Sequence, residues 1–397
     1  MKFDVRHLLD DPFVSMAEPQ PQKTDTSSSV QPIQMNWADP FRPDDVVPDH
    51  VKSAMIHCLN TSAAHYTYPT GDPVLLQEVA KRVRKINGLD VDPERNILIS
   101  GGSDNLFFFV MRPFLVPGKM HEVMMPIPSY SHNFTVPTLM GALSVEVPTY
   151  PEDGYDLRID EFEKRVSDRT RMVVITNPNN PTSTVYRRET LEKLADFVIR
   201  HDLILVVDQA FEDTVYDGHE MCCIATFPGM AERTILLGSI SKGMALCGFR
   251  VAYAVASETI TRIFKECSVF FLGAPNTIAQ AGAIAALQDS SFVEDYRQEY
   301  MERARILSKI LEDIPHISFQ RPESSFIFWV DISWYGTDRD VSEYLAKEAN
   351  ILVSSGSMCG DSKHIRIIFG VMKDRQKVID AVLRIKDALE RHPKNRQ

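Results

Sequence analysis

The sequence predicts an α/β fold: a large domain with a mostly parallel sheet between helices, joined to a smaller α+β domain. The chain has 397 residues, more than one hydrophobic core usually organises. Between Asn96 and Val255, short apolar runs rich in β-branched residues alternate with helix-like segments, which is typical of a parallel sheet covered on both faces. After Pro315 the pattern changes to strand, helix, strand and helix, which predicts the second domain.

The expected strands of the large domain are short and apolar. They are Ile97–Ser100, Glu122–Met125, Met172–Thr176, Leu203–Val207 and Thr234–Gly238. Apolar residues from Leu191 to Val198 recur at helical spacing, so we expect a helix packed on the sheet between the third and fourth strands. Such a connection between parallel strands is a right-handed crossover.

The smaller domain is expected to contain the strands Phe326–Val330 and Ile365–Phe369, with a helix over Val341–Glu348 between them. A final helix follows, whose apolar residues recur on one face. Pro, Gln, Ser and Thr dominate from Ala17 to Gln34, which favours an extended or flexible segment. We therefore expect a partly flexible N-terminal arm (1–34), a large domain (45–290), and a small domain formed by 35–44 with 291–397.

Composition excludes several classes of partner. The formal net charge of -11 argues against nucleic acid and anionic membranes, because both require a basic face. The six cysteines show no metal-ligand spacing, so we expect no metal. They also do not resemble a disulfide framework in a chain of this length, which favours a reducing, cytoplasmic location. Charged residues such as Asp4 and Arg6 stand where a signal peptide would be apolar, and we expect a soluble protein without a membrane partner.

The segment SISKGMALCGFR is the strongest indication of chemistry. It places Ser239, Ser241 and Lys242 at the end of an expected strand, with Arg250 eight residues after the lysine. Open α/β sheets bind ligands at such strand ends, whereas the same residues in an isolated loop would more often be a solvated turn. Two hydroxyls and a guanidinium can hold a phosphate, and an amine can form an imine with an aldehyde. Pyridoxal phosphate is the common cofactor that has both groups.

Other strand ends also carry polar residues. Asp208 ends an apolar strand, so it is either a buried carboxylate that needs a cationic partner, such as a pyridinium nitrogen, or the cap of a turn. Asn180 in NPNNPT can offer its amide to a cofactor hydroxyl or simply belong to a turn. Ser103 and Asp104 in GGSDNL can open a helix whose free amides bind a phosphate. Tyr130 in PIPSY can stack on a planar ring or pack in the core.

In this order, from about Asn36 to Phe369, the segments resemble the class I/II pyridoxal-phosphate-dependent aminotransferases, enzymes of fold type I in the aspartate aminotransferase superfamily. The resemblance implies that Lys242 carries the cofactor and that Asp208 faces the pyridine nitrogen. It further implies that Asn180 binds the ring hydroxyl and Tyr130 stacks on the ring.

The resemblance also extends to the phosphate and the substrate. Ser239, Ser241 and Arg250 would hold the phosphate. Tyr66, five residues before a glycine in HYTYPTG, would reach the phosphate of a neighbouring subunit, which implies a homodimer with shared active sites. Arg366 in HIRIIFG would bind the α-carboxylate of the substrate with its planar fork of donors. Trp37 is a candidate for the wall of the substrate pocket.

Several positions depart from the family pattern. Phe211 stands where a tyrosine commonly donates a hydrogen bond to the ring oxygen. We therefore expect a higher pKa for the imine between Lys242 and the cofactor than in relatives with tyrosine. Ser183 replaces a common glycine, and Ser324–Ser325 stand where glycines are usual. Ser354–Ser355 occupy a segment that commonly carries a proline before Gly356.

The expected activity is transfer of an amino group between an L-amino acid and a 2-oxo acid by a ping-pong mechanism, with Lys242 as the general base at the α-carbon. The alternative is a lyase or decarboxylase on the same scaffold, because the cofactor stabilises the carbanion whichever bond breaks. An amino-acid-sensing regulator of this fold would need an added basic DNA-binding domain, which the acidic, Pro/Ser-rich N-terminus does not predict.

Overall fold

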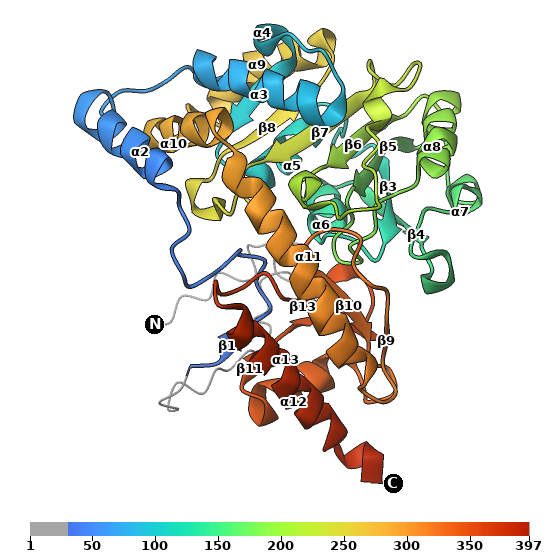
Figure 1. Ribbon diagram of the computed structural model, residues 1–397. Helices are drawn as coiled ribbons and strands as arrows, with labels where there is room; N and C mark the ends of the chain where they lie inside the picture. The colour runs from blue at the N-terminus through green and yellow to red at the C-terminus, as the bar shows by residue number, and fades with distance from the viewer. Residues whose placement is uncertain (1–30, 397) are drawn as a thin grey trace, which may run out of the picture.

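The computed structural model describes residues 31–396 (Figure 1). Most of the expected N-terminal arm, residues 1–30, lies outside the described residues. No helix in the described range is both long enough and apolar enough to cross a membrane. The same range contains no cluster of three or more His, Cys, Asp or Glu side chains that is placed to hold a metal ion.

A seven-stranded sheet forms the centre of the larger part of the molecule. Its strand order is β2-β8-β7-β6-β5-β3-β4, and β8 runs antiparallel to both of its neighbours while the other pairs are parallel. The strands are β2 (Ile97–Ser100), β3 (Glu122–Ile127), β4 (Leu143–Pro148), β5 (Thr170–Thr176), β6 (Ile204–Asp208), β7 (Thr234–Ser239) and β8 (Ala252–Val255). The predicted α/β fold with a mostly parallel sheet is confirmed.

The five strands expected from the sequence are all present, and each end lies within two residues of its predicted position. Strands β4 and β8 were not predicted from the sequence. β4 is an edge strand in the sheet order, and five of its six residues are at least partly exposed, so it lacks a continuous apolar run. β8 has the sequence AYAV, in which two alanines weaken the strand signal.

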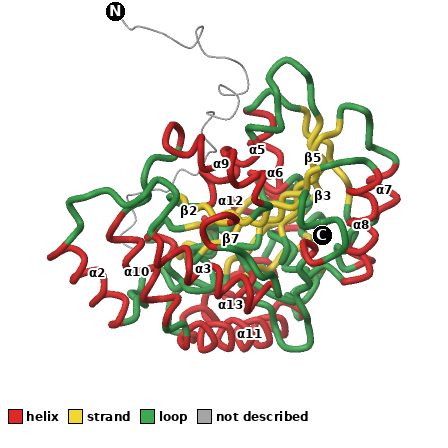
Figure 2. The backbone as a smooth tube through the Cα atoms, turned by 90° about the horizontal axis from the view of Figure 1, so that it is seen from above, coloured by secondary structure: helices red, strands yellow, loops and turns green. Residues whose placement is uncertain are grey.

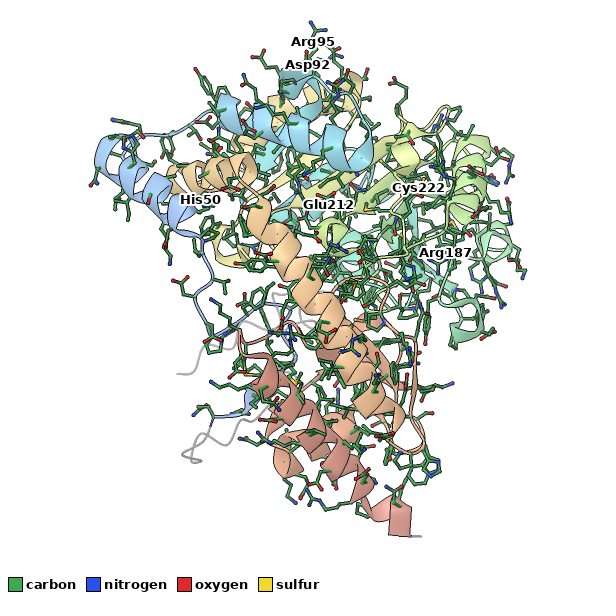
Figure 3. The ribbon with its side chains drawn as sticks, in the orientation of Figure 1. His50, Asp92, Arg95, Arg187, Glu212 and Cys222 are labelled. Atoms are coloured by element: carbon green, nitrogen blue, oxygen red, sulfur yellow. The ribbon has the colours of Figure 1, made fainter. Side chains whose placement is uncertain are left out.

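Helices cover both faces of this sheet, as Figure 2 shows in the view from above. One face packs against α3 (Pro73–Asn87), α7 (Ile159–Glu163), α8 (Arg188–Arg200) and α10 (Thr277–Gln288). The other packs against α5 (Ser103–Met111), α6 (His132–Leu139) and α9 (Glu258–Phe271). Two further helices lie outside these layers. α2 (Asp49–Thr61) packs on α10, and α4 (Pro93–Asn96) packs on α3 and α9. α8 is the predicted crossover helix, and its apolar residues are buried against the sheet.

A second hydrophobic core lies below the sheet in Figure 1. Its antiparallel sheet has the order β12-β13-β10-β9. The strands are β9 (Ser318–Phe319), β10 (Ile327–Asp331), β12 (Ser354–Ser355) and β13 (His364–Ile368), and the helices are α11 (Ser291–Glu312), α12 (Asp338–Glu348) and α13 (Arg375–Glu390). β1 (Ile33–Gln34), at the end of the expected arm, pairs in parallel with β11 (Ile351–Leu352).

The topology gathers the polar segments at one edge of the large sheet. Because β2, β3, β5, β6 and β7 are mutually parallel in direction, their carboxyl ends share that edge. β8 runs the opposite way and therefore begins there, two residues after Arg250. This is the position at which open α/β sheets bind ligands.

Candidate active site

Lys242 lies three residues beyond the end of β7 and is half-buried. Its Nζ donates a hydrogen bond of 2.5 Å to the carbonyl oxygen of Ala38 and lies 3.8 Å from Cys247 Sγ. The sequence did not predict either neighbour. Ala38 acts through its backbone, which carries no residue signature. Cys247 lies within the segment SISKGMALCGFR, but its residue type did not indicate a role there.

Asp208, the last residue of β6, is buried. Its Oδ1 accepts a hydrogen bond of 3.0 Å from the backbone N–H of Ala210. Burial raises the pKa of this carboxyl to about 7, Lys242 opposes the shift, and the nearby acids Asp104 and Glu212 add to it. Among the described residues, no basic side chain lies within ion-pair distance of Asp208. A pyridinium nitrogen is a cation that would satisfy this acid.

The expected phosphate site combines two groups of donors. Ser239 and Ser241 are buried, and their hydroxyls lie 2.7 Å apart. Arg250 approaches from the start of β8, and its Nη2 lies 2.9 Å from Asp104 Oδ2. From the sequence we expected Asp104 to bind the cofactor. In the structure its carboxylate forms an ion pair with Arg250, the arginine of the same site.

The amino end of α5 faces Arg250. The helix begins at Ser103, and no side chain caps its first turn, so its first amides are free to bind an anion. Gly102 precedes it with a φ of +107°, and a Cβ there would lie 2.3 Å from Arg250 Nη2. Glycine at this position therefore permits both the backbone conformation and the close approach of the guanidinium.

Tyr130 lies beyond β3 and contacts the same acid. Its hydroxyl donates to Asp104 Oδ1 over 3.2 Å. His132, which the sequence did not single out, stacks on Tyr130 with ring centroids 4.6 Å apart and an angle of 4° between the rings. Burial, with smaller contributions from Asp104 and Asp208, raises the pKa of Tyr130, and burial lowers the pKa of His132. Both rings are therefore uncharged near neutral pH.

Asn180 and Arg366 meet across the two parts of the molecule. Arg366 Nη1 donates to Asn180 Oδ1 over 3.0 Å, and Nη2 donates to Ser354 Oγ over 3.2 Å and to the Asn36 carbonyl over 3.5 Å. All three acceptors are neutral. Arg366 Nε is buried without a hydrogen-bond partner, and no carboxylate of the described residues pairs with this guanidinium. The site thus contains a cation that is available to an anionic ligand.

Two predicted residues are not brought into contact with this group. Tyr66 is 94% exposed and Trp37 is 64% exposed. Trp37 is nevertheless flanked by Asn36 and Ala38, whose carbonyls accept from Arg366 and Lys242.

Phe211, at the position where a tyrosine was the common residue, is buried in the second core. Its ring packs edge-on against Phe326, with centroids 5.4 Å apart. Phe326 is itself completely buried, so it belongs to the core.

The residues present fit pyridoxal phosphate. Among the described residues, Asp208 has no ion-pair partner, the amino end of α5 has no side-chain cap, the Lys242 amine donates to the Ala38 carbonyl, and Arg366 has neutral partners. Fold and site together therefore define a pyridoxal-phosphate-dependent enzyme of fold type I. Residues 32–382 match the family model described as aminotransferase class I and II, and the chain belongs to this family.

Curated relatives agree along most of the chain. The chain is 32% identical over 352 residues to aromatic-amino-acid aminotransferase 2 of Thermococcus litoralis, which covers 88% of this chain and 90% of the relative. It is 31% identical over 339 residues to an aspartate aminotransferase of Pyrococcus abyssi, which covers 84% and 86%.

Solved structures show the same likeness. The aromatic aminotransferase from Pyrococcus horikoshii OT3 superposes with a TM-score of 0.85 at 31% identity, covering 91% of this chain and 96% of that one. Aspartate aminotransferase from Thermus thermophilus with maleate gives 0.83 at 28% identity, covering 90% and 92%. The chain is a pyridoxal-phosphate-dependent aminotransferase, the first of the two activities that the sequence predicted.

Proposed function

We propose that the residues at the sheet edge perform amino-group transfer in the roles that the sequence predicted, with an aromatic L-amino acid as the preferred donor. The observation that carries the proposal is Arg366, a partly buried cation whose partners among the described residues are neutral. It donates to the Asn36 carbonyl, and the Lys242 amine donates to the Ala38 carbonyl two residues further along the chain. When bound, the cofactor supplies an aldehyde for the amine and a ring that withdraws electrons from the α-carbon.

The holding groups act on different parts of the site. Lys242 Nζ attaches the cofactor. Asp208 becomes ionised when it faces a pyridinium nitrogen and keeps that nitrogen protonated. Arg250, the two serine hydroxyls and the free amides of α5 bind the phosphate. Tyr130 stacks on the ring, and its uncharged hydroxyl stays bonded to Asp104.

The substrate groups follow from the same geometry. Arg366 binds the α-carboxylate through Nη2 and through Nε, which has no hydrogen-bond partner among the described residues. Nη1 stays bonded to Asn180 Oδ1, and the Asn180 amide N–H can donate to the ring hydroxyl. Once its amine is free, Lys242 Nζ would be the general base that removes the proton at the substrate α-carbon and holds it for return. The Ala38 carbonyl, 2.5 Å from Nζ, holds the amine close to this position when it is not bonded to the cofactor.

The preference for an aromatic donor rests on the segment around Trp37. The carbonyls of Ala38 and Asn36 accept hydrogen bonds from Lys242 and Arg366. Trp37 stands between Asn36 and Ala38 and has an exposed indole. An exposed aromatic ring next to a substrate site favours a planar apolar side chain. The Thermococcus relative, which is named for aromatic amino acids, supports this choice.

We also propose a homodimer that completes each site with Tyr66 of the second copy. Tyr66 and Tyr68 are exposed on the connection between α2 and α3, which is bonded to the start of α10, where Thr277 Oγ1 donates to the His65 carbonyl over 2.8 Å. The exposed rings Phe270 and Phe271 lie at the end of α9. Exposed apolar surface of this kind marks interaction sites, and a second copy is the partner that these aromatic rings fit. All six cysteines are free, which supports action in the cytoplasm.

The test is a panel of amino acids added singly to the purified protein with its cofactor, while the visible absorption and the oxo-acid product are followed. We expect phenylalanine, tyrosine and tryptophan to convert the cofactor fastest, with aspartate slower. The Lys242→Ala variant is the control and should show no conversion. Release of carbon dioxide or free ammonia instead of an oxo acid would contradict the mechanism, and a clear preference for aspartate would contradict the proposed donor class.

A further inference from the structure

Two buried serines adopt a backbone conformation that usually requires glycine. Ser183 has a φ of +60° and Ser325 a φ of +61°, and both are completely buried. Residues other than glycine rarely adopt this left-handed region, because the Cβ is crowded against the backbone. Ser183 stands where the sequence resemblance expects glycine, so its hydroxyl needs a reason to be there.

The hydroxyls of these two serines meet. Ser183 Oγ lies 2.6 Å from Ser325 Oγ and donates to the Ile327 carbonyl over 2.8 Å. Ser324 Oγ donates to the Ser183 carbonyl over 3.0 Å, and the Glu323 N–H donates to the same carbonyl over 3.3 Å. The loop after β5 is therefore bonded through Ser183 to the segment that leads into β10.

The backbone of Ser325 is also hydrogen-bonded to the segment that follows β6 in the large sheet. The Ser325 N–H donates to Thr214 Oγ1 over 3.0 Å, and the Ser325 carbonyl accepts from the Tyr216 hydroxyl over 2.5 Å. Thr214 and Tyr216 follow Asp208 and Phe211 along the chain and are buried. Ser325 is thus bonded on both sides by residues that come from the carboxyl ends of β5 and β6.

The hydroxyl pair of Ser183 and Ser325 is connected to the substrate site through the loop that follows β5. Asn180 lies three residues before Ser183 and accepts from Arg366 over 3.0 Å. Arg366 lies in β13, which pairs with β10 so that Trp329 faces Arg366 and Ile327 faces Ile368. The loop after β5 therefore contacts two paired strands, β13 through Asn180 and Arg366, and the start of β10 through Ser183 with Ser325 and Ile327.

We propose that the Ser183–Ser325 hydroxyl pair positions Asn180 against Arg366, and thereby sets how well the site binds the substrate α-carboxylate. The proposal rests on the proposed role of Arg366. The two serines are positioning residues, since neither hydroxyl contacts the groups that are assigned to the substrate. A purely local role, in which the hydroxyls only offset the strained backbone at each serine, is the competing explanation.

Alanine and glycine variants separate the two explanations. Ser183→Ala removes the hydroxyl and keeps the strained Cβ, whereas Ser183→Gly removes both. Positioning predicts that both variants raise the KM for amino acid and oxo acid by roughly tenfold, the effect of losing one buried hydrogen bond, with kcat changed less than about threefold. If the hydroxyl only offsets strain, Ser183→Gly will show wild-type KM values, and the proposal is overturned.

A double-variant cycle on the holoenzyme tests the pair itself. Ser325→Ala should raise KM as Ser183→Ala does, and the combination should raise it no further, because either change removes the same contact. Additive effects would overturn the proposal. Ser268→Ala, which removes a buried hydroxyl bonded only within α9, is the matched control and should leave KM unchanged.

Binding of 3-phenylpropionate, an unreactive aryl carboxylate, gives a readout that does not depend on turnover. Calorimetry should show affinity about tenfold weaker for Ser183→Gly and Ser325→Gly, and equal affinity would overturn the proposal. Glycine variants are used because glycine adopts a positive φ without strain, so these variants should fold as the wild type does. Arg366→Lys distinguishes the two levels of inference: if it also binds normally, the proposed α-carboxylate site is wrong, whereas weak binding by this variant alone overturns only the serine proposal.

Discussion

Replacing Asp208 by asparagine should make the cofactor-free protein more stable at neutral pH while weakening its interaction with the cofactor. Burial raises the pKa of Asp208 from 3.8 to about 7. Below the unfolded pKa the carboxyl is protonated in both states and has no effect. As the pH rises, the unfolded chain ionises first, so the folded state loses relative stability until the pH passes the folded pKa.

The size of the effect follows from that shift. A difference of about 3 pKa units corresponds to about 4 kcal/mol at 1.36 kcal/mol per unit, of which about 2.5 kcal/mol is lost between pH 5 and pH 8. Asparagine carries no charge and avoids this loss. In the holoenzyme we expect the wild type to be more stable than Asp208→Asn, because a pyridinium nitrogen pairs with the carboxylate of Asp208 and cannot pair in the same way with an amide.

The assay is urea unfolding of the cofactor-free wild type and of Asp208→Asn at several pH values between 5 and 8, at one protein concentration. The free energy of unfolding of the wild type should fall with pH relative to that of the variant. Asp160→Asn is the control, because Asp160 is exposed and its pKa is lowered by Lys164, so it is ionised in both states over this range. Parallel curves for the wild type and Asp208→Asn would refute the reasoning.

Three further changes test other parts of the site. Arg366→Lys exchanges a planar fork for a single ammonium and should lower kcat/KM by roughly 10- to 100-fold, mainly through KM; steady-state kinetics with an unchanged KM would contradict the assignment. Phe211→Tyr should lower the pKa of the imine between Lys242 and the cofactor by about one unit, which a pH titration of the visible absorption measures; an unchanged or higher pKa would show that the hydroxyl does not reach the ring. Phe271→Glu places a charge on the exposed aromatic surface at the end of α9 and should shift the protein from dimer to monomer in analytical ultracentrifugation, while an intact dimer would place the interface elsewhere.

The sequence by itself located the main strands of the large sheet and the chemistry at their ends. Both signals are local. An apolar run such as Leu203–Val207 predicts a strand, and the residue that follows it, Asp208, must then lie at the strand end. The edge strand β4 was not predicted, because polar and partly exposed residues interrupt its apolar run.

Tertiary structure decided which of these residues touch. Asn180 meets Arg366 across 186 positions of the chain, Lys242 meets the Ala38 carbonyl across 204, and Ser183 meets Ser325 across 142. The packing of the two cores places these segments together, and a backbone carbonyl such as that of Ala38 has no residue type to reveal it.

The charge of Asp208 illustrates the same division. The sequence indicates a carboxyl at the end of an apolar strand, whereas the extent of its burial and the absence of an ion-pair partner among the described residues depend on the packed helices and loops around it. Burial is what raises its pKa, because removal of water disfavours the ionised form. Residue type and spacing determined which chemistry is present, and packing decided where each group lies and how it is charged.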